Sequence, residues 1–354
     1  MSTFLQFHLL TTYGPSNPNR DDQGRPKQAM VGGSPRLRMS SQSVKRALRE
    51  SAFFELDLQG NMGIRTKRLF EKLVEHLDAQ GVPGDVASEA AAQVAEIFGK
   101  LEAPNKADGN RVASTLAFVS PEEWRLAEDL AGKIVAGEDM PKEKDLKKLV
   151  LRHADGAVDI AMFGRMLAAD ADFNRDAAVQ VAHAITTHTA QAEEDWFSAV
   201  DDLNKAEDTG AGHLGETAFG SGVYYQYVCV NADLLVDNLD GDRDLAAKGA
   251  EALARAIAQT SPRGKQNSFA HHPRAHYVLA EKGTQAPRDL SGAFFSPIRE
   301  QPILDSSVAS LVRTRDDIDE AYGQAWDADC IMHVGVGGTL DEIVLFAGDA
   351  VRDA

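Results

Sequence analysis

A block of helical pattern, residues 64–180, interrupts a chain that otherwise alternates strands with helices. Its clearest helix start has Ser120 as N-cap, Pro121 in the first turn and Glu123 closing a capping box. The apolar side chains recur at amphipathic spacing, so the block is locally self-contained and we interpret it as a helical insertion. Its predicted helices are 66–81, 120–137, 141–154 and 175–188.

The segments outside this block predict the fold class. Residues 3–13 alternate as in a strand with one fully apolar face, and a helix is expected from Ser40 or Ser41 to about Phe54. Without the insertion the order is β, α, β, α, β, α, β, which is typical of an α+β sandwich of the ferredoxin-like or RNA-recognition type. The later strands are predicted at 222–231, 276–283 and 327–338, and the later helices at 244–259 and 306–323.

Two segments lack a clear period. Residues 14–36 form a long predicted loop rich in Gly, Pro, Asn and Asp, and loops of this length are usually functional or disordered. Residues 189–221 are polar and contain glycine, yet they carry Trp196, Phe197 and Leu214. The adjacent aromatic pair either packs against a neighbour or stacks on nucleic-acid bases, and the sequence leaves both interpretations open.

The overall composition predicts a cytoplasmic, soluble protein. The chain has 354 residues, 43% of them hydrophobic, which favours two domains or one elaborated domain. Its first residues lack the charged start of a signal peptide, and no stretch approaches the roughly 20 apolar residues of a membrane span. Cys229 and Cys330 lie in apolar strand-like runs, which indicates buried reduced thiols.

Positive charge is concentrated in two short stretches of an acidic chain. The net charge is −17, but the residues from Arg20 to Arg49 include eight basic and two acidic ones, a local net of +6. A second stretch, 261–276, has no acid, three histidines and three basic residues, one of which is Lys265. Because clustered Lys and Arg bind phosphates, these stretches predict a localised anion site.

The helix after Ser40 is the best anion site. Lys45 and Arg49 stand four residues apart and repel each other slightly unless an anion bridges them. The helix N-terminus adds backbone N–H groups and the hydroxyls of Ser40, Ser41 and Ser43. Arg36 and Arg38 alternate along the approach, while Arg46 can pair with Glu50 in solvent. A polyphosphate site is therefore predicted, with a solvated basic face as the alternative.

Other polar groups have simpler interpretations. Asp21 and Asp22 could bind Mg²⁺ for phosphodiester cleavage, but no third carboxylate supports them and loop aspartates commonly accept local N–H bonds. His183 and His188 are five residues apart, which places them on different faces of the predicted helix and favours core or polar contacts over zinc. Nothing in the sequence amounts to a catalytic constellation.

Seven motifs, in this order and spacing, resemble the CasC family, the backbone subunits of the type I-E CRISPR Cascade complex in the RAMP superfamily. The likeness is specific over roughly 1–55 and 155–230 and looser elsewhere. The motifs are NRDD…K (19–27), GG…R-x-R-x-SSQS-x-KRA-x-R (32–49), D-I-A-x-x-GRM (159–166), AHAITTH (182–188), DWF-x-AVDDL (195–203), HLG (213–215) and S-GV-Y-Y (221–225).

The resemblance implies a hand-like α+β protein in three parts. An RNA-recognition-motif-like (ferredoxin-like) palm would comprise 1–60 and 222–354, helical fingers would be inserted at 61–181, and a protruding thumb would span 182–221. Copies of such a subunit stack head to tail along a CRISPR RNA. Each thumb reaches the next copy and displaces bases of the guide at regular intervals.

Residue by residue, the resemblance and the charge pattern together give a set of expected contacts. Met166 would contact bases, and Trp196, Phe197 and Leu214 would surround the displaced nucleotide. By resemblance, Arg20, Lys27, Ser40, Gln42, Lys45 and Arg49 would hold the guide's phosphates and riboses; the pattern of basic and hydroxyl groups adds Arg36, Arg38, Ser43, Arg46 and Lys265.

The resemblance implies a subunit that is not an enzyme and needs no cofactor or metal. Its partners would be the CRISPR guide RNA, target DNA through guide pairing, further copies of itself and other Cascade subunits. No association with a membrane is expected. Two alternatives stay open. One is a metal-dependent RAMP ribonuclease using Asp21 and Asp22, and the other is an assembly protein that binds no nucleic acid.

Overall fold

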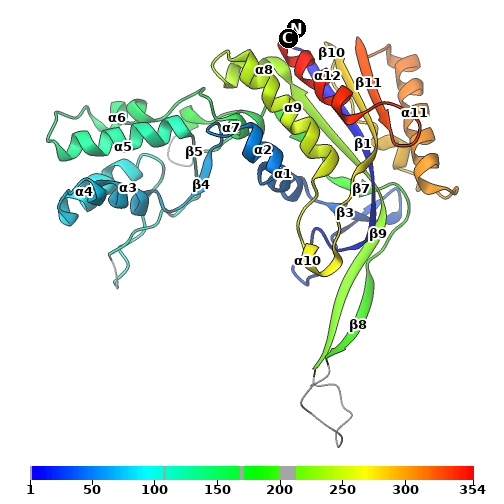
Figure 1. The fold of residues 1–354 in the computed structure, drawn as a ribbon, viewed down its shortest axis with the longest axis horizontal. Coiled ribbons are helices and arrows are strands. Elements are labelled where there is room, and N and C mark those ends of the chain that lie inside the picture. The colour runs from blue at the N-terminus through cyan, green and yellow to red at the C-terminus, as the bar shows by residue number, and fades with distance from the viewer. Residues whose placement is uncertain (1, 107–108, 168–170, 200–212) are drawn as a thin grey trace, which may run out of the picture. The chain divides into compact units, whose positions relative to one another are not determined.

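The computed structural model describes residues 2–106, 109–167, 171–199 and 213–354. It is a mixed α/β structure with an antiparallel sheet, in agreement with the predicted mixture of strands and helices (Figure 1). The chain divides into two compact units, which we describe separately. Unit 1 comprises Met1–Phe54, Gln180–Val230 and Ala250–Asp353; unit 2 comprises Glu55–Val179, Asn231–Gly249 and Ala354.

Unit 1 is built on the sheet, whose strand order is β11-β10-β1-β9-β7-β3-β2. Two further strands, β6 and β8, pair with β9. The central strand β1 is buried on both faces from Leu5 to Leu10. Leu5, Phe7 and Leu9 form its apolar face, whereas the buried Gln6 and His8 lie on the other face. The strands are β1 (Phe4–Ser16), β2 (Gln28–Val31), β3 (Ser34–Met39), β6 (Val179–Val181), β7 (Ala184–Thr186), β8 (Glu193–Ala199), β9 (His213–Asn231), β10 (Ala275–Gly283) and β11 (Ala328–His333).

Helices cover this sheet, and Figure 1 shows α9 and α12 lying across it. On the face that includes Leu10 and Leu279, the apolar core is completed by Phe294 and by Leu311 of α11. The strands and helices predicted on either side of the insertion are confirmed, except as noted below. Strand β11 ends at His333, short of the predicted residue 338, and β9 begins at His213, before the predicted residue 222. The helices that lie wholly or partly in unit 1 are α1 (Ser41–Arg49), α2 (Ala52–Asp57), α9 (Arg243–Gln259), α10 (Gln266–Phe269), α11 (Ile303–Tyr322) and α12 (Leu340–Arg352), with a 3-10 turn η2 (Ser291–Phe294).

Three predictions about unit 1 were wrong or incomplete. Residues 175–188 form strands β6 and β7 instead of a helix, because pairing with β9 satisfies their backbone. The predicted loop 14–36 contains the β2–β3 hairpin, which turns at two glycines with positive φ, Gly32 and Gly33. The helix after Ser40 ends at Arg49, and a separate helix α2 follows it.

Unit 2 has a core of its own, formed by Leu73, Leu77, Val94 and neighbouring apolar residues. The capping box at Ser120 and Glu123 is confirmed, with both reciprocal hydrogen bonds present. The helices are α3 (Leu69–Ala79), α4 (Gly84–Ala95), α5 (Pro121–Val135), α6 (Glu143–Val150), α7 (Val158–Phe163) and α8 (Ala232–Asn238), with η1 (Ala171–Phe173) and the paired strands β4 (Ile64–Thr66) and β5 (Ala117–Val119).

The compact units do not follow the expected palm, fingers and thumb boundaries closely, since unit 2 also includes residues 231–249. The three-part division stays a prediction. Cys229 is a buried free thiol, as expected, whereas Cys330 is partly exposed. Among the described residues, no helix is both long and apolar enough to cross a bilayer.

Candidate nucleic-acid interface

The start of α1 is fixed by hydrogen bonds from its own cap and from the preceding loop. The Ser40 hydroxyl oxygen accepts a bond from the Ser43 backbone N–H at 3.3 Å, which confirms Ser40 as the N-cap. Asn19 Oδ1 accepts the Ser40 N–H at 2.8 Å, and the Asn19 carbonyl accepts the Lys27 N–H at 2.9 Å. The loop that carries Arg20 and Lys27 is therefore tied to this helix terminus.

Two polar stripes run along α1. Val44, Ala47 and Leu48 are buried, as predicted, whereas the polar residues of α1 are partly or fully exposed. At 100° per residue, Gln42, Lys45 and Arg49 form one stripe, and Ser43, Arg46 and Glu50 form the next. The predicted pair Arg46–Glu50 is confirmed, with Nε to Oε1 at 2.8 Å in solvent. The first turn of α1 contains no acid, which leaves the positive end of the helix dipole uncompensated within the helix.

Arg36 cannot contact RNA, and its assignment to the phosphate site was wrong. Its side chain is fully buried, and its guanidinium donates to the Phe294 carbonyl at 3.0 Å and to the Thr186 carbonyl at 3.4 Å. Burial lowers the pKa of Arg36. The alternation of Arg36 and Arg38 suggested a shared direction, but β3 lies inside the sheet and buries Arg36.

We expect Arg36→Met to leave RNA affinity unchanged, while the free energy of unfolding falls by about 1–3 kcal/mol because two buried carbonyls lose a donor. Urea unfolding and RNA anisotropy on the same preparation measure both quantities. A large loss of RNA affinity in a variant that remains folded would contradict the structural role.

Arg38 and the two histidines are arranged around the start of α1 and β7. Arg38 is partly exposed, and its Nη1 lies 3.2 Å from His183 Nδ1. His183 Nδ1 also accepts a hydrogen bond from the Ser41 backbone N–H at 3.1 Å. His188 Nε2 accepts the Val223 N–H at 3.2 Å. Both histidines make polar contacts, as predicted, although they lie beside strands and not on a helix.

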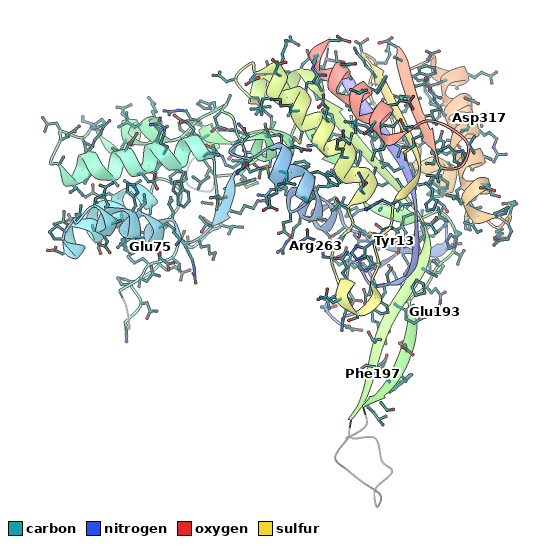
Figure 2. All side chains as sticks on the ribbon, in the orientation of Figure 1. Tyr13, Glu75, Glu193, Phe197, Arg263 and Asp317 are labelled. Carbon is teal, nitrogen blue, oxygen red and sulfur yellow. The ribbon has the colours of Figure 1, made fainter. Side chains whose placement is uncertain are left out.

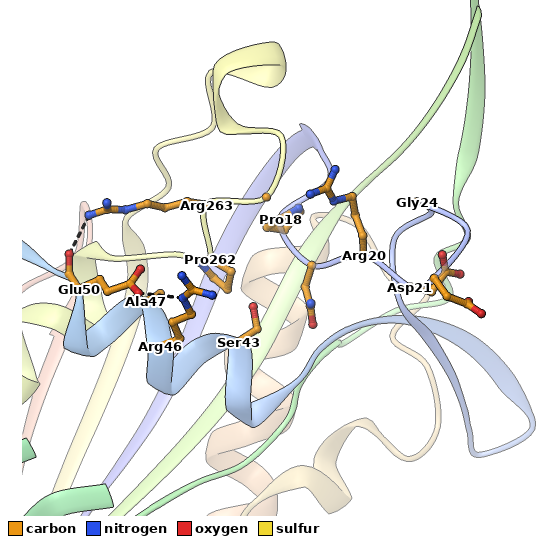
Figure 3. Close-up of a pocket in the computed structure, with 13 residues that line it drawn as sticks. Pro18, Arg20, Asp21, Gly24, Ser43, Arg46, Ala47, Glu50, Pro262 and Arg263 are labelled. Atoms are coloured by element: carbon orange, nitrogen blue, oxygen red, sulfur yellow. Dashed lines mark hydrogen bonds and ion pairs between the residues drawn. The ribbon is translucent and has the colours of Figure 1, made fainter. Parts of the chain in front are cut away.

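A pocket of about 610 Å³ lies between α1, the loop 18–24 and the segment 262–264, and its lining residues are drawn in Figure 3. Arg20, Arg46 and Arg263 line it together with three acids. Sequence reasoning missed Arg263, whose Nη2 donates to the Glu50 carbonyl at 2.8 Å. The signal was present, since the basic stretch 261–276 contains no acid.

Asp21 is engaged in its own loop. Its Oδ1 accepts the backbone N–H groups of Gln23 at 3.0 Å and Arg25 at 2.9 Å, which is the local capping role predicted as the alternative to metal binding. In the parts of the chain that are described, no group of three or more His, Cys, Asp or Glu side chains is arranged to hold a metal ion.

Lys265 joins the first basic stretch in space. More than 200 residues separate Lys265 from Arg20 and Arg25 in the sequence, yet the three residues line one pocket of about 450 Å³. Arg25 is paired there with Glu194 at 2.7 Å. The two basic stretches seen in the sequence therefore meet on one surface of unit 1.

The predicted thumb residues lie on the ribbon formed by β8 and the first part of β9, and Figure 2 shows Phe197 and Glu193 on β8. Trp196 pairs with Glu216 and Ser198 with Leu214, so Trp196 and Leu214 share one face of the ribbon. They are 70% and 69% exposed. Phe197 lies on the other face over Gly215, where an added Cβ would come within 2.3 Å of its ring. The predicted motif DWF-x-AVDDL continues beyond Ala199 into residues outside the described ones.

Met166 is 82% exposed in unit 2, next to a buried ion network. Arg165 is buried, pairs with Glu123 and donates to the Phe118 carbonyl at 3.2 Å. Arg175 binds both oxygens of Asp155 at 2.8 and 2.9 Å. The backbones of Arg165 and Arg175 also form a β-bridge, which fixes the main chain directly before Met166.

The fold and this surface define a mixed α/β protein with a basic site at a serine-capped helix start, an arrangement suited to holding polyanions. The chain belongs to the CT1975-like protein family, whose model matches residues 5–342. The sequence has no match among curated proteins.

Two solved structures are similar to this chain over almost its full length. One chain, described as "CRISPR RNA-guided surveillance complex, pre-nicking", is 29% identical with a TM-score of 0.85, and the match covers 97% of this chain and 100% of that one. Another, described as "CRISPR RNA-guided surveillance complex", is 25% identical with a TM-score of 0.71 at the same coverage. The predicted kinship with Cascade backbone subunits is confirmed by the family and by these structures.

Proposed function

We propose that this chain is a non-catalytic backbone subunit of a cytoplasmic type I-E Cascade surveillance complex. It would bind CRISPR guide RNA, oligomerise head to tail along it and present it for pairing with target DNA in antiviral defence. The observation that carries the proposal is the start of α1, a serine-capped terminus of the helix that bears Lys45 and Arg49. Hydrogen bonds tie it to the loop with Arg20 and Lys27. This set suits phosphate binding without base readout.

The sheet and the ribbon support the finer assignments. The neighbouring strands β10-β1-β9-β7 agree with a ferredoxin-like palm of the RNA-recognition type. Helix α1 follows β1 after the β2–β3 hairpin, and helices α8 and α9 follow β9. Within unit 1 the β8–β9 ribbon extends beyond the rest of the sheet in Figure 1, as a thumb that reaches a second copy would. Exposed Trp196 and Leu214 supply a face that can cover a displaced nucleotide.

The test is whether the purified protein carries RNA of a defined length. We expect the protein expressed with a CRISPR array to co-purify with a single guide-sized RNA and to lose it as salt rises, because phosphate contacts release counterions. Protein expressed without the array is the control. Absence of bound RNA at moderate salt would favour a protein-only assembly role.

A cleavage assay tests the non-catalytic part of the proposal. With complementary RNA and Mg²⁺, we expect the assembled complex to leave the RNA intact, and Asp22→Ala to behave as the wild type. Cleavage that Asp22→Ala abolishes would instead support a RAMP ribonuclease. Asp22 is the informative position because Asp21 also holds its loop together.

A further inference from the structure

A second pocket in unit 1, of about 650 Å³, lies beyond the C-terminal end of α1. Its size is within the range of about 300–1,000 Å³ typical of ligand sites. None of the described residues that line it is acidic, whereas three acids line the pocket of Figure 3. Its lining includes Phe53, Ser261, Arg263, Lys265, Gln266 and Arg274.

The walls of this pocket are held by hydrogen bonds that leave donors available. Arg263 bonds the Glu50 carbonyl through Nη2, and Arg274 bonds the Gln259 carbonyl through Nη1 at 2.7 Å. A guanidinium has five N–H donors, so each of these contacts uses only part of the group. Gln266 Nε2 bonds the His271 carbonyl at 3.0 Å, which closes the short helix α10 onto the segment after it.

The backbone around α10 is strained at two non-glycine residues. Lys265 and Ala270, which flank α10, have φ values of 52° and 51°. Left-handed conformations of such residues cost about 1–3 kcal/mol and concentrate at binding sites. Gly264 also approaches Pro18 closely, since an added Cβ would lie 2.4 Å from the Pro18 carbonyl oxygen. The chain therefore keeps an unfavourable conformation that presents Lys265 at the pocket.

The lining chemistry fits a nucleotide unit of a strand better than a small carboxylate. Arg263, Lys265 and Arg274 are all exposed cations, which repel one another unless an anion lies between them. Amides and hydroxyls can bond a ribose, and the partly buried Phe53 offers a ring for base stacking. Arg263 also lines the pocket of Figure 3, so the two surfaces are continuous along α1.

We propose that this acid-free pocket binds a phosphodiester of the guide RNA, extending the RNA path beyond the start of α1. The inference rests on the proposed function, since it assigns a second contact to the same strand. Arg263, Arg274 and Phe53 thereby become RNA-contacting residues beside Lys265.

Charge reversal in the pocket provides the first test. We expect the double variant Lys265→Glu, Arg274→Glu to bind guide-length single-stranded RNA about tenfold or more weakly, because charge-assisted bonds are lost. The slope of log affinity against log salt should fall by about 0.7 for each lost phosphate contact. The matched control is Arg299→Glu, Arg313→Glu, which makes the same charge change at exposed positions of unit 1 and should leave affinity and slope unchanged.

Crosslinking provides a second test that does not depend on how the charge variant folds. With a photoreactive benzoylphenylalanine at Phe53, we expect a crosslink to the guide RNA in the assembled complex. RNA bound without this crosslink, or a crosslink to the target DNA strand in its place, would overturn the pocket assignment and leave the proposed function standing. If the wild type binds no RNA, both fall.

Discussion

A chain in which Lys45 and Arg49 are both replaced by glutamate is expected to purify without guide RNA. These residues lie on one stripe of α1, next to a helix terminus that contains no acid in its first turn. Two charge-assisted contacts are lost and two carboxylates are placed against the phosphates, so we expect affinity to fall about a hundredfold or more. Fluorescence anisotropy with labelled guide RNA, repeated over a salt series, measures the loss.

The matched control makes the same charge change away from α1. The double variant Arg299→Glu, Arg313→Glu reverses two exposed cations of unit 1. We expect it to bind RNA with nearly wild-type affinity. If Lys45→Glu, Arg49→Glu retained RNA with an unchanged salt dependence, the helix would be a solvated basic face and the proposed phosphate site would be wrong.

Local signals in the sequence predicted most helices and strands correctly. The capping box at Ser120 depends on residues three apart, so it could be recognised without any knowledge of the fold. The same signal stands at Thr339 and Glu342, which begin the unpredicted helix α12. The turn at Gly32 and Gly33 was likewise readable, since paired glycines are typical of two-residue hairpins.

Long-range pairing explains what the sequence could not reveal. The apolar residues of 175–188 are compatible with the period of a helix or with that of a strand. Pairing with β9 makes this segment form strands. The same limit applies to the site. Arg263 donates to the Glu50 carbonyl, which is 213 positions away in sequence. The buried Arg36 donates to the carbonyls of Phe294 and Thr186, 258 and 150 positions away. Contacts within one helix, such as Arg46 with Glu50, were predictable.

The largest stability effect is expected from Glu281→Gln in the buried polar network of unit 1. The Glu281 carboxylate is fully buried and lies 2.7 Å from both Arg288 Nη1 and Arg315 Nε. It is also 3.4 Å from His8 Nε2, so a single residue joins β10 to β1, to α11 and to the segment before η2. Removing one partner of a buried ion pair costs about 3–5 kcal/mol, because the remaining charges stay desolvated.

An exposed ion pair of the same length provides the control. Arg352 Nη2 lies 2.7 Å from Glu251 Oε1, but the two side chains are 40% and 27% exposed. Glu251→Gln should therefore cost about 1 kcal/mol or less. Urea unfolding of the two variants beside the wild type gives the comparison. Equal, small losses in both variants would show that the network around Glu281 contributes no more than a surface pair.

The pH dependence of this difference separates the charge of Glu281 from its packing. Burial alone would raise the pKa of Glu281, but contacts with His8 and Arg288 outweigh burial and hold it at about 2, below the ordinary 4.5. A carboxylate with a lowered folded-state pKa stabilises the fold fully above its unfolded pKa and loses that contribution as the pH falls through the folded value. The difference in unfolding free energy between wild type and Glu281→Gln should therefore be largest above about pH 5 and shrink progressively toward about pH 2. A difference that stays constant over this range would mean that the side chain acts through shape and neutral hydrogen bonds, and that the two arginines are not held by its charge.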